Sequence, residues 1–350
     1  MFFASDNAGP VHPKVMAALH EANTGHALPY GDDELMDEVR QRLRDLFEAP
    51  DAAVYLVATG TAANALALAT MCKPWQTVFC SPVAHIQEDE CNAPEFYSGG
   101  AKLTLVPGGD RMCPEALRSA IKAEENRGVH GPQRGPVSIT QVTESGTVYD
   151  LDELRALTEI AQEFQLPVHM DGARIANAVV KLDCTLAQMT WKLGVDAVSF
   201  GGTKNGLMGV EAVIFFDPAK AQEFEYRRKR GAHLFSKHRY LSAQMAAYLR
   251  DDLWRECALK ANANARRLAQ GLEQAGAEIL HRPDANMVFA ALPRRIHHRL
   301  LAAGAQYYPW TGDFNGPADE MLGARLVCDW SLDTADINRF LDILQTSVSE

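Results

Sequence analysis

The segment His169–Arg174, which reads HMDGAR, joins an apolar strand to a tight turn that carries one carboxylate, Asp171. Further along the chain, the expected strand 197–200 ends at a second polar turn, GGTKNG, which places Lys204 among glycines. The interval between Asp171 and Lys204 is long enough for one helix and one return strand. Because parallel strands end at the same edge of a sheet, we expect both side chains to emerge there together.

Outward from these two turns, short β-branched runs alternate with longer segments whose apolar residues recur at helical spacing. This alternation predicts an α/β fold in which a mainly parallel, seven-stranded sheet is covered by helices. The strands are expected at 53–57, 77–80, 103–106, 137–142, 168–170, 197–200 and 212–216. Helices are expected at 61–71, 114–125 and 151–164.

The last part of the chain has a different pattern. A long helix is expected at 254–275, strands at 286–292 and 325–328, and a further helix after each strand. This α+β pattern predicts a second domain, and 350 residues are enough for about two domains. We place the boundary near Asp251. It separates a large domain, 1–250, whose N-terminal segment contributes to the active site, from a small domain, 251–350.

The composition excludes several classes of protein. Hydrophobic residues make up 47% of the chain and charged residues 23%, unlike a disordered chain, a collagen or a disulfide-rich miniprotein. The net charge of −11 disfavours nucleic acid and membrane surfaces as partners. The basic run Arg227–Arg230 is interpreted as a solvated helix face. The uncharged segment 52–72 is long enough to span a membrane, but Thr59–Thr61 and Asn64 at its middle favour a buried strand, a turn and a buried helix.

Cysteine usage points to a reducing compartment. The seven cysteines are odd in number, contain no CxxC pair and include thiols in apolar surroundings, such as Cys80 and Cys328. The N-terminus reads MFFASD, without the basic region and long apolar stretch of a signal peptide. We therefore expect a cytoplasmic protein.

The polar residues that follow the strands are those of a cofactor site. Lys204 lies among glycines, which let the backbone approach a ligand closely, and a partly desolvated lysine amine forms Schiff bases; an ordinary loop lysine is the alternative. Asp171 can hold a protonated ring nitrogen by a charge-assisted hydrogen bond. Thr59–Thr61 lies between a strand and a helix, where N–H groups and hydroxyls bind phosphate. His85 follows the next strand and can stack on a flat ring, unless it is structural. A lysine, an acid and a phosphate site are what pyridoxal phosphate requires.

Together these segments resemble the fold-type I pyridoxal phosphate enzymes, in particular the threonine aldolase branch of the β-eliminating lyase family. The resemblance covers nearly the whole chain, and the pair HMDGAR and GGTKNG is its most specific part. The supporting segments are Ser5–Asn7, Tyr30–Asp33, Gly60–Asn64, Ala84-His85 and Arg325–Trp330.

The resemblance implies a role for most of these residues. Lys204 is the Schiff-base lysine, Asp171 the partner of the pyridine nitrogen and His85 the stacking residue. The phosphate-binding residues are Thr59, Gly60 and Thr61. The residues that hold the substrate carboxylate are Ser5, Arg174 and Arg325, and Arg174 also lies near the cofactor. Beside them, we expect Tyr30 and Asp89 to bind the substrate. Family members are usually homotetramers with active sites at subunit interfaces, and Lys237 is matched to a cation that a neighbouring subunit adds to the phosphate.

One departure from the family concerns the residue that contacts the substrate β-hydroxyl. Many members have Glu-Asn-Thr-His where this chain reads Thr143–Gly146, so a histidine is missing there. His130 can replace it, or the acids Glu88, Asp89 and Glu90 can, unless these acids are helix-surface charges. We expect no metal at the acids, since no loop of cation-binding spacing surrounds them.

A histidine suits the task of general base because its unperturbed pKa lies near neutral pH. We expect a shared arrangement in which His85 lies against the ring, while His130 and Asp89 position the hydroxyl.

The expected activity is cleavage of L-threonine, L-allo-threonine or a related β-hydroxy-α-amino acid, such as phenylserine, to glycine and an aldehyde. The choice of the L-configuration follows from the resemblance alone. The alternatives on the same fold are β-elimination, racemisation and transamination. A nucleotide-binding or regulatory α/β protein without a Schiff base is the alternative from another class.

Overall fold

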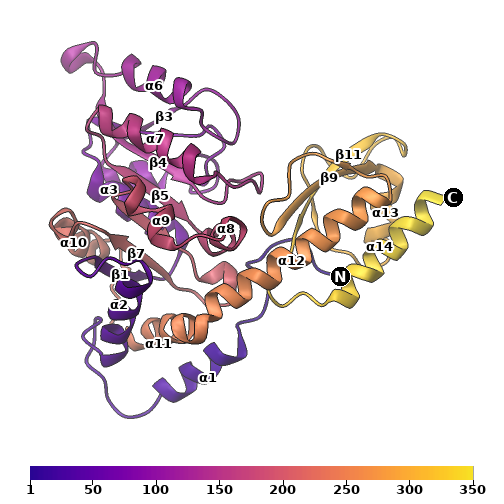
Figure 1. Cartoon of the computed structure of the whole chain (residues 1–350), viewed down its shortest axis with the longest axis horizontal. Helices are drawn as coiled ribbons and strands as arrows, with labels where there is room; N and C mark the ends of the chain where they lie inside the picture. Colours follow the sequence, from indigo (N-terminus) through magenta and orange to yellow (C-terminus); the bar gives the residue numbers. More distant parts are fainter. Residues whose placement is uncertain (350) are drawn as a thin grey trace.

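The computed structural model of the chain describes residues 1–349 and contains two β-sheets (Figure 1). The larger sheet has the strand order β1-β7-β6-β5-β4-β2-β3. Its strands are β1 (Ala53–Val57), β2 (Gln76–Cys80), β3 (Lys102–Leu105), β4 (Gln133–Thr140), β5 (Val168–Gly172), β6 (Ala197–Phe200) and β7 (Glu211–Phe215). Strands β2 to β6 pair in parallel, whereas β7 is antiparallel to both β6 and β1. The predicted mainly parallel, seven-stranded sheet is therefore confirmed.

Helices cover both faces of this sheet, because alternate residues of its strands enter different apolar cores. In β1, Val54 and Leu56 join one core and Val57 joins another. On the side of Val54 lie α2 (Glu34–Leu46), α6 (Pro114–Ala123), α7 (Leu151–Glu163), α8 (Ile175–Leu182), α9 (Leu186–Met189) and α11 (Arg239–Leu249). On the side of Val57 lie α3 (Gly60–Met71), α4 (His85–Glu88), α5 (Ala93–Ser98) and α10 (Gln222–Arg230).

Local sequence explains where several of these helices begin. Thr59 accepts a hydrogen bond from the N–H of Ala62 and starts α3. Asp150 and Glu153 form a capping box at α7, and Pro114 occupies the first turn of α6. The uncharged segment 52–72 contains β1 and α3, so its interpretation as a buried strand, turn and helix is confirmed. Within residues 1–349, no helix is both long and apolar enough to cross a membrane.

The second sheet is antiparallel and belongs to the C-terminal part of the chain. Its order is β10-β11-β9-β8, with β8 (Glu278–Ile279), β9 (Met287–Pro293), β10 (Tyr308–Pro309) and β11 (Met321–Val327). Three helices accompany it, α12 (Leu253–Gln274), α13 (Arg294–Ala302) and α14 (Thr334–Ser349). Figure 1 shows α12 running from the large sheet toward the small one. The predicted boundary at 250/251 falls in the short 3-10 turn Arg250–Asp252, just before α12, and stays a prediction. Residue 350 lies outside the described residues.

The N-terminus packs against this second sheet. Phe2 forms a β-bridge with Gln306, and Phe3 is buried beside Phe340 with their ring centroids 5.0 Å apart. The helix α1 (Pro13–Ala22) then contacts α11 of the large part. The segment between these contacts, which includes Ser5 and Asp6, is thereby held between the two sheets.

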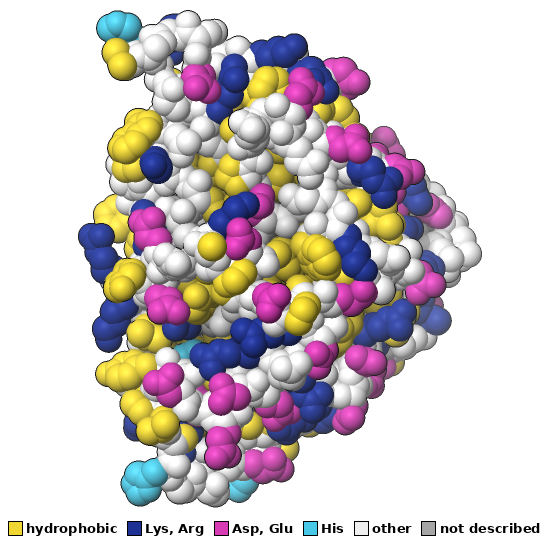
Figure 2. Space-filling model, turned by 60° about the vertical axis from the view of Figure 1, so that its left-hand side comes forward, with side chains coloured by type: hydrophobic (Ala, Val, Ile, Leu, Met, Phe, Trp, Pro, Cys, Tyr) yellow, Lys and Arg dark blue, Asp and Glu magenta, His cyan; other side chains and the backbone are white. Residues whose placement is uncertain are grey.

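Charge is distributed without one large patch on the face shown in Figure 2, where Lys and Arg side chains are interspersed with Asp and Glu. The basic run in α10 differs from the solvated face that the sequence predicts. Arg228 is buried with its guanidinium over the ring of Tyr55, and Arg227 bonds to Glu223 and to the carbonyl of Tyr97. Half of this run therefore packs against the protein.

Candidate functional site

Asp171 and Lys204 meet at one edge of the large sheet, as predicted. Asp171 lies near the end of β5 opposite Ser199 of β6, and Lys204 lies in the short 3-10 turn Thr203–Asn205 that follows β6. Both side chains line a cavity of about 380 Å³. Thr59, Gly60, Thr61 and His85, all predicted cofactor residues, line the same cavity.

Glycine explains how the two turns come so close. A Cβ atom on Gly201 would overlap the backbone of Ala173, so only glycine lets the loop of Lys204 lie on the turn of Asp171. The loop is anchored further by the N–H of Gly202, which donates to Oε2 of Glu211 at 2.6 Å. Sequence reasoning missed Glu211, which is buried in β7 and also lines the cavity.

The carboxylate of Asp171 is fixed from two sides. Oδ1 accepts from the N–H of Ala173 at 3.0 Å, and Oδ2 accepts from Nδ2 of Asn64 at 2.8 Å. Asp171 is 3% exposed, so its orientation is set by protein groups and not by bulk water. A buried, oriented carboxylate of this kind can bind a protonated ring nitrogen.

Asn64 connects Asp171 to a second carboxylate. Nδ2 of Asn64 also donates to Oε1 of Glu90 at 2.9 Å, and the same oxygen lies 2.8 Å from Nδ1 of His85. The hydrogen bond with Glu90 raises the pKa of His85, although burial acts in the opposite direction. Glu90 is buried, so it is not the helix-surface charge that the sequence left open.

The N-terminus of α3 supplies an anion site beside this network. Gly60 and Thr61 occupy the first turn of the helix, where backbone N–H groups lack intrahelical acceptors. A Cβ atom on Gly60 would meet nothing within 4 Å, so the helix end is open toward the cavity. The donor set fits a phosphate group there.

A second cavity of about 700 Å³ continues from the first, because His85, Glu144 and Lys204 line both. Its wall contains four predicted substrate residues, Ser5, Asp89, Arg174 and Arg325. Arg325 comes from β11 of the small sheet and makes no ion pair with the described residues. Burial lowers the pKa of Arg325, and the positive charge of Arg174 acts in the same direction. Two adjacent guanidinium groups at this wall favour an anionic ligand such as a carboxylate.

Glu144 is a site residue whose role the sequence did not predict, although its segment was noted as a departure. It lies after β4 and faces both cavities. Burial raises its pKa, while the charges of Arg174 and Lys204 act in the opposite direction. Its position in a loop gave no periodic signal that could have identified it.

Three predicted site residues line neither cavity. His130 is exposed in the 3-10 turn Gly128–His130 before β4, and Lys237 is exposed in the loop before α11. Tyr30 is also exposed, with Nζ of Lys229 4.8 Å from its ring centroid. Within a single chain, these side chains stand outside the site.

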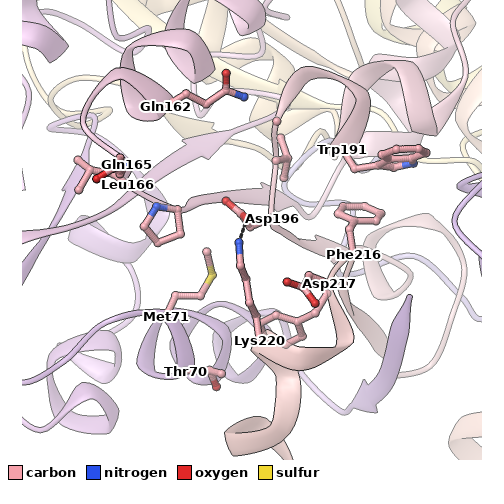
Figure 3. A pocket seen from close by; sticks show the side chains of 14 residues that line it. Thr70, Met71, Gln162, Gln165, Leu166, Trp191, Asp196, Phe216, Asp217 and Lys220 are labelled. Atoms are coloured by element: carbon pink, nitrogen blue, oxygen red, sulfur yellow. Dashed lines mark hydrogen bonds and ion pairs between the residues drawn. The ribbon is translucent and has the colours of Figure 1, made fainter. Parts of the chain in front are cut away.

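A larger cavity, of about 780 Å³, lies away from these residues (Figure 3). Nζ of Lys220 bonds there to Oδ1 of Asp196 at 2.6 Å, and the rings of Trp191 and Phe216 lie to one side. Because its lysine is paired and the predicted cofactor residues are elsewhere, size does not make it the active site.

In the described part of the chain, no group of three or more His, Cys, Asp or Glu side chains has an arrangement suited to a metal ion.

Comparison with known proteins identifies the family. A model of the beta-eliminating lyase family matches residues 3–294. The low specificity L-threonine aldolase of Pseudomonas aeruginosa is 41% identical over 334 residues, which are 95% of this chain and 93% of that protein. The threonine aldolase of Leishmania major has a solved structure that matches with a TM-score of 0.92 and 26% identity over 99% of both chains. Serine palmitoyltransferase of Sphingomonas wittichii matches in fold, with a TM-score of 0.73 and 15% identity over 99% of this chain and 86% of that chain. This chain belongs to the beta-eliminating lyase family.

Proposed function

We propose that the chain is a pyridoxal phosphate-dependent aldolase that cleaves L-threonine, L-allo-threonine or a related β-hydroxy-α-amino acid, such as phenylserine, to glycine and an aldehyde. The observation that carries the proposal is the meeting of Lys204 and Asp171 at one cavity that opens toward two arginines. The threonine aldolases of P. aeruginosa and L. major, which match most of this chain, support the same reaction.

The residues of the first cavity fit the cofactor. Nζ of Lys204 would hold the aldehyde carbon, Asp171 would pair with the ring nitrogen, and His85 would stack on the ring. The phosphate binds at the open start of α3, where Thr59, Gly60 and Thr61 lie. Bound in this way, pyridoxal phosphate supplies an electron-accepting ring conjugated with the amino group of the substrate.

Asp171 has an electrostatic task in this arrangement. Its buried carboxylate keeps a proton on the ring nitrogen, and Asn64 and the N–H of Ala173 keep that carboxylate in place. That proton would make a bound ring a better electron acceptor, which is the chemistry that cleavage of the Cα–Cβ bond requires.

The second cavity orients the substrate. Arg325 and one remaining edge of Arg174 bind the carboxylate, with Ser5 as a further contact and Tyr30 contributing from a second copy of the chain. Holding the carboxylate would fix the direction of the Cα–Cβ bond relative to a bound cofactor, which is an orientation effect. His85 receives the proton of the β-hydroxyl, and Asp89 and His130 position that hydroxyl.

We also infer a homotetramer with active sites at subunit interfaces. His130, Lys237 and Tyr30 are exposed and outside both cavities, so a contribution from them requires a second copy of the chain. Lys237 would then add a cation to the phosphate of a neighbour. Light scattering on the purified holoenzyme tests the assembly, and a monomer with full activity would contradict it.

We infer a cytoplasmic location from the cysteines. All seven are free, and Cys72, Cys80, Cys257 and Cys328 are buried. Unpaired thiols fit a reducing compartment. Fractionation of the native cells, with the protein found only in a membrane or secreted fraction, would contradict this inference.

Product analysis tests the function. Holoenzyme incubated with L-threonine should release glycine and acetaldehyde in equal amounts. Formation of 2-oxobutanoate and ammonia would instead indicate β-elimination, and accumulation of a second stereoisomer would indicate racemisation. The Lys204→Ala variant provides the background rate.

A further inference from the structure

Glu90 occupies an unusual position for a glutamate in this protein. Its side chain is fully buried, with 0% exposure, and it contacts His85 and Asn64, which both line the cavity of the candidate cofactor site. Oε1 accepts from Asn64 at 2.9 Å and lies 2.8 Å from Nδ1 of His85, while Oε2 has no hydrogen-bond partner among the described residues. A buried carboxylate is costly in free energy unless its charge is compensated, so packing alone does not account for it.

The contact with Glu90 fixes the proton on His85. Burial raises the pKa of Glu90, while its hydrogen bonds with His85 and Asn64 act in the opposite direction and favour the ionised form. An ionised carboxylate only accepts hydrogen bonds, so Nδ1 of His85 carries the hydrogen that points to Glu90. In the neutral imidazole the free lone pair is then on Nε2. His85 lines both cavities, with 27% of its side chain exposed, so one edge is held by Glu90 and the ring adjoins the space for substrate.

Asn64 joins this pair to the cofactor side of the site. Its single amide nitrogen donates one hydrogen to Glu90 and one to Asp171. Asn64 therefore holds two carboxylates at a fixed separation. The carboxylate of Glu90 contacts the imidazole of His85, and the carboxylate of Asp171 lines the first cavity. The charged groups besides Glu90 that act on His85 are Asp171 from β5, Lys204 from the turn after β6 and Glu144 from the loop after β4.

We propose that Glu90 is a positioning residue that holds His85 with Nδ1–H toward Glu90 and Nε2 toward the substrate, so that His85 is the base that removes the β-hydroxyl proton. The inference rests on the proposed retro-aldol function and deepens it. The hydroxyl proton moves to Nε2, the Cβ–O bond becomes the aldehyde carbonyl, and the Cα–Cβ bond breaks with its electron pair left on the glycine fragment. Cα of the glycine fragment then takes up one proton from solvent to complete glycine, and the proton on Nε2 is returned to solvent.

The experiment compares Glu90→Gln with wild type in the holoenzyme. Glutamine keeps the shape and can accept both hydrogen bonds at its oxygen, but it removes the negative charge. We expect kcat for L-threonine to fall by about 10- to 100-fold, which is less than the roughly 100- to 10,000-fold that general-base assistance contributes, because His85 itself is still present. Without the anion, His85 becomes less basic, so the acid limb of the kcat/KM profile should move to lower pH.

Two further measurements separate a positioning role from a structural one. The dissociation constant of pyridoxal phosphate, measured by fluorescence titration, should change less than threefold. Exchange of the α-hydrogen of glycine with deuterated water, which involves no β-hydroxyl, should also stay within threefold of wild type. Equal losses in exchange and cleavage would place the effect of Glu90 on the cofactor and overturn the proposal.

A double variant supplies the sharpest comparison. If Glu90 acts through His85, adding Glu90→Gln to His85→Asn should slow cleavage no further. The role would be refuted if the losses of the two single variants multiply in the double variant. It would also be refuted if the acid limb of the kcat/KM profile does not move in Glu90→Gln.

Glu124→Gln is the matched control, because Glu124 is also buried, accepts from Thr104 at 3.0 Å, and lies outside both cavities. A wild-type enzyme that exchanges glycine but forms none from threonine would instead count against the proposed function.

Discussion

Arg174 and Asp6 form a buried ion pair with two hydrogen bonds. Nε of Arg174 donates to Oδ2 of Asp6 at 2.7 Å and Nη2 donates to Oδ1 at 3.0 Å, with both side chains almost fully buried. Asn286 of the small part also donates to Oδ2 at 3.0 Å. One edge of the Arg174 guanidinium is therefore occupied by Asp6, and only the other edge is available to a substrate. The pair also fastens the N-terminal segment to the active site.

The pair should make stability depend on pH. Burial alone would raise the pKa of Asp6, but the charge and hydrogen bonds of Arg174 outweigh it and lower the pKa from 3.8 to about 2. A carboxyl with a lowered pKa in the folded state contributes stability that is complete above about pH 4 and is lost as the pH falls through 2. In urea unfolding, wild type should lose more stability between pH 5 and pH 3 than Asp6→Asn does. Parallel pH dependences would show that the pair contributes no such stability.

At pH 7, Asp6→Asn should itself be destabilised, because it leaves the guanidinium of Arg174 buried without a counter-charge. Breaking a buried pair in this way costs about 3 to 5 kcal/mol. Arg118→Ala, which removes an exposed ion pair with Glu163, is the comparison and should cost about 1 kcal/mol or less.

Arg325→Ala should weaken the binding of threonine far more than that of the cofactor. A hydrogen bond to a charged group contributes about 1.5 to 3 kcal/mol, so KM should rise by about 10- to 100-fold. Steady-state kinetics give KM, and fluorescence titration gives the cofactor dissociation constant. A normal KM with lost cofactor would move Arg325 to the phosphate end of the site.

Asp171→Asn should retain the cofactor and lose turnover. The asparagine oxygen can still accept from Asn64, but its NH2 group then takes the place of Oδ1, which accepts from the N–H of Ala173, and the side chain has no negative charge to favour a protonated ring nitrogen. We expect kcat to fall by more than the tenfold that corresponds to about 1.4 kcal/mol. Near-full activity in this variant would mean that the ring lies elsewhere in the cavity.

His130→Ala tests the least supported member of the predicted site. If His130 reaches a neighbouring active site, its removal should change the rate ratio between L-threonine and L-allo-threonine and leave the cofactor absorbance unchanged. An unaltered ratio and rate would make His130 a surface residue, in keeping with its exposed position in the single chain.

The sequence predicted those parts of the fold that depend on local pattern. The strands 53–57 and 197–200 have the predicted limits, and the helix expected at 151–164 ends one residue earlier, at Glu163. The direction of β7 was not predicted. The connection 201–210 is too short for the crossover that parallel strands require, so β7 returns antiparallel to β6.

For the site, the sequence predicted the residues that directly follow strands. It did not predict the residues that form hydrogen bonds with them. Asp171, Lys204 and His85 lie where a parallel sheet directs them. Asn64, Glu90 and the Asp6–Arg174 pair depend on hydrogen bonds between distant parts of the chain, and no periodicity reveals such bonds. His130 and Lys237 were assigned by matching positions, and a single chain does not bring them to the cavity.

The most direct test is to identify the lysine that holds the cofactor. Holoenzyme reduced with borohydride, digested and mapped by mass spectrometry should carry the pyridoxyl group on Lys204, and Lys204→Ala should carry none while remaining folded. A pyridoxyl group on Lys181, Lys192 or any other lysine, with Lys204 unmodified, would contradict the account.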